Sequence, residues 1–198
     1  AMWKLGDKEL ICWTIDEALL SESIDKLIIT SIDEELIYFL KTKYSNSKIE
    51  FIVRDPKTFD KKESTSDLLL NIAKNNKEFD IIVLLNQESP FRGHLYIDKA
   101  INTCQVFNLD NVIAARQDEE IFFIHDGKGL INRRPDVNKK LERDDLYRKV
   151  GGLTIIRTKS LISSGKILSG RVGHVILDQR SAFSIRTKFD WNLANLIV

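Results

Sequence analysis

The chain has 198 residues, with 30 basic and 29 acidic side chains and a formal charge of +1. Binding to nucleic acid or to a membrane surface depends on a concentrated positive field, and this balance supports neither. Apolar residues make up 43% and charged residues 30%, which is typical of a soluble globular protein. No apolar run reaches the ~18 residues of a membrane span. The opening AMWKLGDKEL does not resemble a signal peptide, so we expect a cytoplasmic protein.

Helical and strand-like periods alternate along the chain, and the two cysteines, Cys12 and Cys104, lie in apolar patterns that predict buried free thiols. In chain order, the sequence predicts helix 10–22, strand 25–31, helix 32–44, strand 48–55, helix 64–76 capped by Ser64 or Thr65, strand 79–86, helix 93–107, strand 111–117, an extended segment 120–130 with a glycine turn, strand 150–158, helix 158–165 ended by Gly165, strand 171–178 and helix 188–198.

This alternation predicts an α/β fold with a parallel sheet covered on both faces. Ligands of such sheets lie beyond the carboxyl ends of the strands. The loops of interest therefore follow Ser31, Asn86, Gln117 and Asp178. The sequence has no glycine-rich phosphate loop, and its three histidines lack metal-ligand spacing. We expect His94 in the first turn of a helix and His174 in a buried strand.

The segment NQESPFR, residues 86–92, directly follows the predicted strand 79–86. Asn86 offers an amide, Ser89 a hydroxyl, and Arg92 a planar fork suited to a carboxylate or phosphate. The segment is thus a candidate polar shelf for a ligand. The structural alternative is a strand-to-helix turn in which Ser89 caps the helix and Arg92 is solvated.

Two further loops carry candidate residues. Asn132 is followed by Arg133 and Arg134, which could clamp an anion or be merely solvated. The stretch 171–191 contains Asp178 and Asp190, but these lie on opposite sides of a loop and do not form the tight carboxylate pair that Mg²⁺ would need. The alternative for Asp190 is a first-turn charge that favours the helix dipole.

Five segments, in this order, resemble the acylneuraminate cytidylyltransferase family, also called CMP-sialic acid synthetases. GDKELICWTIDEALLSESIDKLIITSIDEELI is similar to the family stretch with "GKPLI-WTI" and "VVVSTDDEEI", and LLNQESPFRGHLYIDKAI to "LLQPTSPLRTAEDIDEAI". INRRPD resembles "NRRQD", and LYRKVGGLTII resembles "VYRLNGAIYI". Residues 170–198 resemble the closing "GRVGAYVMPRERSVDIDTELDWELAELLL". The similarity covers essentially the whole chain.

The resemblance implies a Rossmann-like three-layer sandwich of the nucleotide-diphospho-sugar transferase type, with a mostly parallel sheet, as a single domain over residues 1–198. It implies CTP, a nine-carbon keto-acid sugar and Mg²⁺. The anomeric hydroxyl of the sugar would attack the α-phosphorus of CTP, releasing pyrophosphate and forming a CMP-sugar. It also implies a homodimer formed through residues 118–148.

Site residues carry over by position. The resemblance implies sugar-binding roles for Asn86, Ser89, Arg92, Asn132, Arg133, Arg134 and Gly152. It implies nucleotide-binding roles for Ser31 and Asp33.

The sequence departs from the family pattern at the nucleotide side. Ser184 and Arg186 stand at the family's two metal-holding aspartates, so a cation replaces a metal ligand. One unit-charge contact at ~4 Å is worth roughly 4 kcal/mol at an effective dielectric near 20, which makes Mg²⁺ binding doubtful here. Ile32, Glu88 and Gly151 also replace family polar residues.

The family's N-terminal strand and basic phosphate loop have no counterpart in residues 1–198. Because that strand is central to the family's sheet, its loss would leave unpaired buried backbone groups. We expect either a further N-terminal segment in the protein or other strands that close the gap. Two functions remain open: a cytidylyltransferase, or a non-catalytic sugar- or nucleotide-binding domain derived from one.

Overall fold

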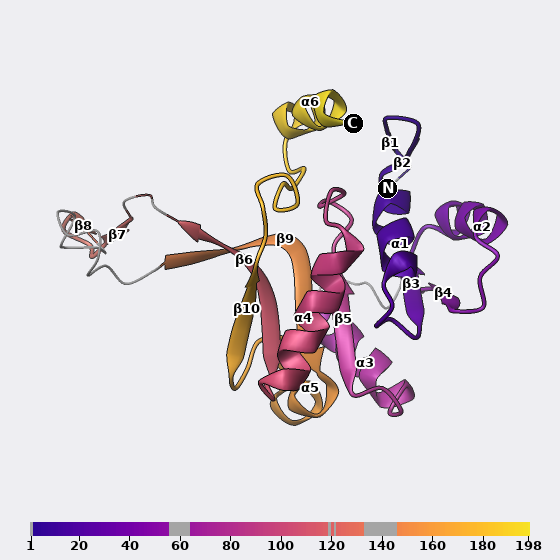
Figure 1. The fold of residues 1–198 in the computed structure, drawn as a ribbon, viewed down its shortest axis with the longest axis horizontal. Helices are drawn as coiled ribbons and strands as arrows, with labels where there is room; N and C mark the ends of the chain where they lie inside the picture. The colour runs from indigo at the N-terminus through magenta and orange to yellow at the C-terminus, as the bar shows by residue number, and fades with distance from the viewer. Residues whose placement is uncertain (1, 56–63, 119, 121, 133–145) are drawn as a thin grey trace.

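The computed structural model describes residues 2–55, 64–118, 120, 122–132 and 146–198. Its helices are α1 (Leu10–Leu20), α2 (Glu34–Lys43), α3 (Thr65–Asn75), α4 (His94–Val106), α5 (Thr158–Ser164) and α6 (Lys188–Ile197). Its strands are β1 (Lys4–Leu5), β2 (Lys8–Glu9), β3 (Leu27–Ser31), β4 (Ile49–Val53), β5 (Ile81–Leu85), β6 (Asn111–Asp118), β7 (Phe123–His125), β8 (Leu130–Asn132), β9 (Leu146–Arg157) and β10 (Val172–Ile176). Each predicted helix and strand has a counterpart within a few residues (Figure 1).

Local signals account for several of the helix ends. Ser64 and Asp67 form a capping box at the start of α3, which confirms the predicted cap. Asp33 accepts a hydrogen bond from Leu36 N at the start of α2. Gly165 ends α5 at φ +67°, a left-handed conformation that favours glycine.

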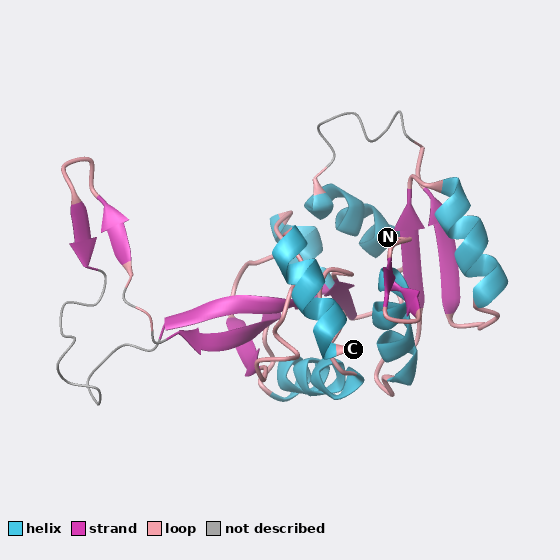
Figure 2. Ribbon diagram, turned by 90° about the horizontal axis from the view of Figure 1, so that it is seen from above, coloured by secondary structure: helices cyan, strands magenta, loops and turns pink. Residues whose placement is uncertain are grey.

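The main sheet has four strands in the order β10-β6-β9-β5, with helices packed against it (Figure 2). β6 and β10 are parallel, and both β5 and β6 are antiparallel to β9. Strands β5, β6 and β10 therefore share one direction. The α/β fold class with a mostly parallel sheet is confirmed, and β9 is the strand of this sheet that runs the other way. The described part of the link from β6 to β9 is the β7–β8 hairpin, and an antiparallel return needs no crossover helix.

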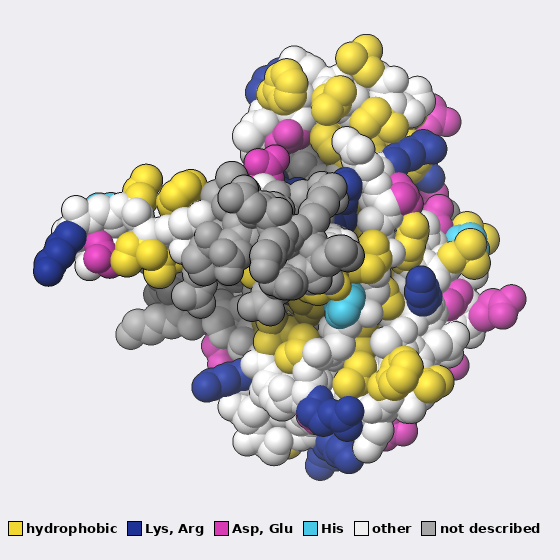
Figure 3. Space-filling model, turned by 60° about the vertical axis from the view of Figure 1, so that its left-hand side comes forward, with side chains coloured by type: hydrophobic (Ala, Val, Ile, Leu, Met, Phe, Trp, Pro, Cys, Tyr) yellow, Lys and Arg dark blue, Asp and Glu magenta, His cyan; other side chains and the backbone are white. Residues whose placement is uncertain are grey.

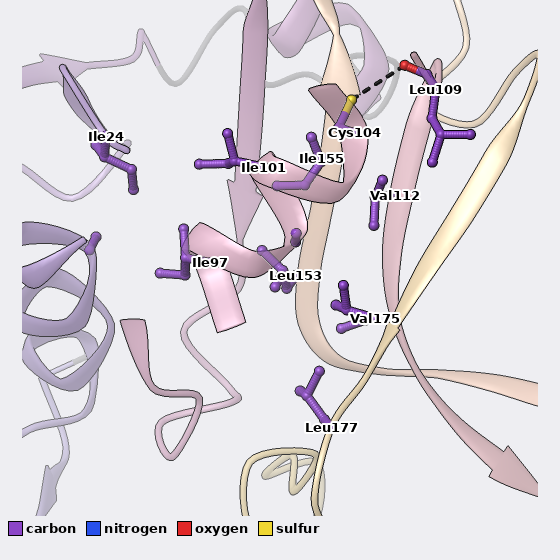
Figure 4. Close-up of a cluster of buried hydrophobic side chains, with 13 residues drawn as sticks. Ile24, Ile97, Ile101, Cys104, Leu109, Val112, Leu153, Ile155, Val175 and Leu177 are labelled. Carbon is purple, nitrogen blue, oxygen red and sulfur yellow. Dashed lines mark hydrogen bonds between the residues drawn. The ribbon is translucent and has the colours of Figure 1, made fainter. Parts of the chain in front are cut away.

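The largest core cluster joins α4 to β6, β9 and β10 (Figure 4). Ile97 and Ile101 of α4 are buried there with Leu153 and Ile155 of β9. Cys104 donates from Sγ to the Leu109 carbonyl at 3.3 Å inside this cluster. Both cysteines are buried free thiols, as predicted. The core thus fixes α4 behind the sheet and places its first residue beside the carboxyl end of β5.

Strands β3 and β4 form a separate parallel pair. Among the described residues, no strand lies between β3 and β5, and a cavity of about 680 Å³ is lined by both. The described strands therefore do not close the gap that the family resemblance leads us to expect. In the same part of the chain, no helix is both long enough and apolar enough to cross a membrane.

Candidate functional site

The turn after β5 is tied to two other segments at the carboxyl edge of the sheet. Asn86 donates from its backbone N to the Gly152 carbonyl at 2.9 Å, and its Nδ2 donates to Glu88 Oε1 at 2.8 Å. Ile185 N donates to the Glu88 carbonyl at 2.7 Å. The turn 86–92, the 151–152 region of β9 and the loop after β10 are therefore one connected unit, and we call these three segments the shelf.

Arg92 is the last residue of the turn 86–92, and only 1% of its surface is exposed. Its Nη1 donates to the carbonyls of Gly151 and Gly152 at 2.6 and 3.0 Å. Burial lowers the pKa of Arg92 to about 10, against the opposing effect of the Glu88 and Glu17 carboxylates. The guanidinium therefore remains charged at neutral pH. The structural alternative of a solvated Arg92 is wrong.

Two groups of the buried guanidinium have no hydrogen-bond partner among the described residues. They are Nε and Nη2 of Arg92. An unpaired buried polar group costs free energy comparable to a lost hydrogen bond, and more when it is charged. The buried cation thus keeps two covered donors that the described residues leave unpaired.

Ser89 is also buried, and its Oγ lies 2.7 Å from Ser184 Oγ. This contact joins a predicted sugar-binding position to a position that the family gives to a metal ligand. Ser89 does not cap α4, because the N-cap residue is Gly93 and it makes no side-chain cap bond. The capping alternative for Ser89 is therefore also wrong.

Gly151 and Gly152 adopt left-handed backbone conformations at φ +65° and +51°. A Cβ on Gly152 would lie 2.8 Å from Asn86 Cβ and 3.1 Å from Ser89 Oγ. A Cβ on Gly151 would lie 2.4 Å from Leu177 Cδ2. Glycine is required at both positions by conformation and by space.

Asp178 follows β10 and anchors the start of its loop. Tyr96 OH donates to Asp178 Oδ2 at 2.7 Å, and Ser181 donates from both N and Oγ to the same carboxylate. These donors hold the pKa of Asp178 well below its usual range. Sequence reasoning missed Tyr96 and Ser181. The available signal was a tyrosine two residues into the helix that follows the turn 86–92.

The described residues at the family's metal positions do not fit a divalent cation. Ser184 is hydrogen-bonded to Ser89, and Arg186 brings a positive charge. Asp190 Oδ2 accepts hydrogen bonds from Arg186 N and from Thr187, as the third residue of a capping box at the start of α6. This confirms the helix-end interpretation of Asp190. Within the described ranges, no three His, Cys, Asp or Glu side chains are grouped so as to hold a metal ion.

The predicted nucleotide positions have local roles at the end of β3. Asp33 N donates to Ser31 Oγ at 3.0 Å, and Asp33 caps α2. Ser31 lines the cavity between β3 and β5, which Ser89 and Arg92 do not line. In the described part of the chain, no hydrogen bond joins Ser31 or Asp33 to the shelf.

Asn132 ends β8, and the hairpin projects away from the main sheet in both ribbon views (Figures 1 and 2). The fold does not bring Asn132 to the shelf of its own chain. Arg133 and Arg134 lie outside the described residues.

The histidines are placed in the predicted elements. His94 opens α4, and its Nδ1 lies 2.9 Å from Glu17 Oε2. His174 lies in β10, although its side chain is exposed rather than buried. The Tyr147 ring lies against it at a centroid distance of 4.5 Å.

Solved structures share this fold. A 4-diphosphocytidyl-2C-methyl-D-erythritol synthase from Anaerococcus prevotii superposes with a TM-score of 0.75 at 16% identity, covering 98% of this chain and 87% of that one. A CMP:2-keto-3-deoxy-manno-octonic acid synthetase complexed with CTP superposes with a TM-score of 0.70 at 11% identity, covering 99% and 90%. At these identities the likeness establishes the Rossmann-like α/β fold.

Curated relatives extend over nearly the whole chain. The post-translational flagellin modification protein B of Campylobacter coli is 25% identical over 98% of this chain and 86% of its own length. The N-acylneuraminate cytidylyltransferase of Escherichia coli is 22% identical over 96% of this chain, which spans only 46% of that relative. Residues 1–142 match the cytidylyltransferase family. Because this match covers well over half of the sequence, the chain belongs to the cytidylyltransferase family.

Proposed function

We propose that the protein is a cytidylyltransferase whose acceptor is a nine-carbon keto-acid sugar of the sialic-acid type, bound at the shelf. The observation that carries the proposal is the convergence of four predicted sugar positions. Asn86 N and Arg92 Nη1 both donate to the Gly152 carbonyl, and Ser89 packs against the same glycine. If the sequence similarity to the family had arisen by chance, there would be no reason to expect contacts among these residues in the folded chain.

Charge at the shelf supports an anionic ligand. The Arg92 guanidinium is charged and buried, and a low-dielectric surrounding strengthens its attraction for a carboxylate. Glu88 would oppose an anion, but its Oε1 accepts a hydrogen bond from Asn86 Nδ2, which partly offsets its charge. Arg92 would act mainly by positioning the two glycines, because its side chain is covered.

The name of one relative, the N-acylneuraminate cytidylyltransferase of Escherichia coli, supports this acceptor class. In the proposed reaction, the anomeric hydroxyl of the sugar attacks the α-phosphorus of CTP, and pyrophosphate leaves. Such catalysis depends on positioning and on neutralising the triphosphate charge. In the loop 178–187, Arg186 places a positive charge where the resembled family has a metal-holding aspartate.

A second candidate is sugar binding without transfer. The observation that favours it is the presence of Ser184 and Arg186 where a metal-dependent enzyme would need carboxylates. Both candidates share the shelf and differ in what happens to CTP.

One experiment separates them. Thermal unfolding is measured with N-acetylneuraminate, with 2-keto-3-deoxy-manno-octonate and with 2-C-methyl-D-erythritol 4-phosphate, each with and without CTP and Mg²⁺, and pyrophosphate release is followed in parallel. A ligand at 100 times its Kd adds about 2.7 kcal/mol, or roughly 5–10 °C for a chain of this size. Transfer predicts a shift with a keto-acid sugar together with pyrophosphate release. A sugar shift without pyrophosphate release supports binding alone, and no shift with either keto-acid sugar would exclude both.

We also propose a homodimer formed through the projecting hairpin. Phe123 of β7 is 53% exposed, and Leu130 of β8 is 68% exposed. Figure 3 shows hydrophobic side chains gathered on this projection. A two-stranded hairpin is marginally stable alone, so an apolar surface on it favours a covering partner. A second copy would also place Asn132 against a surface other than that of its own chain.

A further inference from the structure

The segment 178–188, which leads from the end of β10 into α6, has a charge opposite in sign to that of the family stretch it resembles. It contains three basic side chains, Arg180, Arg186 and Lys188, and one acidic side chain, Asp178. The corresponding family letters, PRERSVDIDTE, contain two basic and four acidic residues. A divalent cation needs the acidic set, whereas the set in this chain attracts an anion.

Backbone hydrogen bonds alternate in direction along the middle of this segment, which forms neither a helix nor a turn. Ile185 N donates to the Glu88 carbonyl at 2.7 Å, whereas Arg186 N donates to Asp190 Oδ2 at 3.0 Å. In an extended chain, successive side chains point to opposite faces. The side chains of Ser184 and Arg186 therefore share one face.

The face that carries Ser184 is directed toward the shelf. Ser184 Oγ lies 2.7 Å from Ser89 Oγ. The Ile185 side chain, on the opposite face, packs against the buried cluster that contains Phe91. Arg186 therefore extends from the same face as a residue that contacts a predicted sugar position.

The Arg186 guanidinium is available to a ligand. Arg186 is exposed, and within the described ranges its side chain forms no hydrogen bond or ion pair. The carboxylate that faces it is Asp190, whose Oδ2 accepts from Arg186 N and from N and Oγ1 of Thr187. These hydrogen bonds, and to a smaller extent the charge of Arg186, lower the pKa of Asp190. Asp190 is thus engaged by the start of α6, while the guanidinium keeps its donors.

A second guanidinium lies on the same segment. Arg180 is exposed, and its Cζ lies 5.4 Å from the centroid of the Phe91 ring, so this cation lies against the turn after β5. The carboxylate of that turn is Glu88, whose Oε1 accepts from Asn86 Nδ2. Asp178 is likewise engaged, by Tyr96 and Ser181. The acidic groups of this region are therefore hydrogen-bonded within the protein, whereas the two exposed cations can bind an anion.

We propose that the segment 178–188 binds the phosphate groups of the nucleotide through Arg186, with Arg180 as a second cation, and that this binding needs no divalent metal ion. A guanidinium presents a planar fork of donors that matches phosphate oxygens. Its charge is part of the chain, so it takes the place of a charge that carboxylates would otherwise have to recruit. The inference rests on the proposed function for the identity of the ligand, whereas its charge argument requires only an anionic phosphate group.

Calorimetric titration tests this with two probes, CTP and inorganic pyrophosphate, each in EDTA and in excess Mg²⁺. We expect both probes to bind in EDTA and to gain no affinity from Mg²⁺. Arg186→Ala should weaken binding in EDTA at least about tenfold, because a hydrogen-bonded charge contact is lost. Arg186→Lys keeps the charge and should retain most of the affinity.

Lys159→Ala is the matched control. Lys159 is an exposed cation of α5, which follows the end of β9 at the amino end of β5, opposite the shelf. Its removal should leave binding unchanged. Arg186→Ala keeps the backbone N–H that Asp190 accepts, so the Tm of this variant should equal that of the parent.

The inference is overturned if neither probe binds in EDTA, if binding requires Mg²⁺, or if Arg186→Ala binds as tightly as the parent chain. Release of pyrophosphate from CTP with a keto-acid sugar is measured separately and tests the proposed function. Release that requires Mg²⁺ would overturn this inference and leave the proposed transfer standing. Metal-free binding that is lost in Arg186→Ala, without any release, would support this inference and favour binding without transfer.

Discussion

The hydroxyl of Ser89 lies 2.7 Å from the hydroxyl of Ser184, which stands at a metal position of the family. Ser89 comes from the turn after β5 and Ser184 from the loop after β10, so the contact links the two segments across the shelf. A hydrogen bond between neutral groups contributes about 1 kcal/mol net.

Removing this contact should show coupling between the two serines. We expect Ser89→Ala and Ser184→Ala each to lower the free energy of unfolding by about 1 kcal/mol, and the double variant to lose about 1 kcal/mol less than the sum. Urea unfolding measures all three. Ser163→Ala, at an exposed position of α5, should change stability by less than about 0.5 kcal/mol. Strict additivity would show that the serines do not interact in solution.

Gly152 should be far less tolerant of a side chain than Gly165. Both are left-handed, at φ +51° and +67°, but only Gly152 has neighbours in the way. Gly165→Ala should cost about 1 kcal/mol of backbone strain, whereas Gly152→Ala adds a collision with Asn86 and should cost about 2–4 kcal/mol in total. Thermal unfolding compares the two. If both variants lose the same free energy of unfolding, the turn 86–92 moves to accommodate the added methyl group without a free-energy cost.

Local sequence patterns predicted most of the elements. The short, continuous apolar run of β5 and the three-and-four spacing of α4 identify these elements without tertiary information. Asp190 was predicted as a possible first-turn charge of the last helix, and the structure has a capping box of Thr187 and Asp190 there. These features depend on neighbours within four residues.

The site was less predictable, because its contacts span long separations. Arginine side chains are rarely fully buried, so the sequence alone favoured a solvent-exposed Arg92. Its burial depends on carbonyls 59 and 60 residues away that only the fold directs inward. The reversed direction of β9 had no local signal either, since a parallel strand and an antiparallel strand can share one apolar sequence.

Asp178 should make stability depend on pH. Its folded pKa lies below the ordinary value of 3.8, so its contribution is complete above that value and is lost as the pH falls below it. We expect Asp178→Asn to cost about 1 kcal/mol at pH 7, with the difference from the parent chain shrinking from about pH 4 downward. Urea unfolding between pH 7 and 3 measures this.

Tyr96→Phe provides the matched comparison. It removes one of the donors to Asp178 and leaves those of Ser181 in place, so the loss should be smaller and the pH dependence only partly reduced. A constant gap between Asp178→Asn and the parent chain at every pH would contradict the assignment.

The projecting hairpin should control self-association. Leu130→Glu places a charge on each copy of a symmetric apolar contact, and the two lost leucines should weaken dimerisation by at least about a hundredfold. Size-exclusion chromatography with light scattering over a dilution series measures the change. Leu95→Glu alters an equally exposed leucine on α4 and should leave association unchanged. A chain that is monomeric throughout would refute the dimer.

Carboxylates placed at positions 184 and 186 should create a dependence of stability on Mg²⁺. In the double variant Ser184→Asp and Arg186→Asp, two acidic oxygen ligands replace a hydroxyl and a cation, which changes repulsion of Mg²⁺ into attraction. We expect Mg²⁺ to raise the Tm of this variant in the presence of CTP by several degrees, and to leave the parent chain unchanged. The variant Ser184→Asn with Arg186→Gln removes the cation without supplying carboxylates, so it should respond like the parent. An equal Mg²⁺ response in the parent would show that other residues of the protein bind the metal.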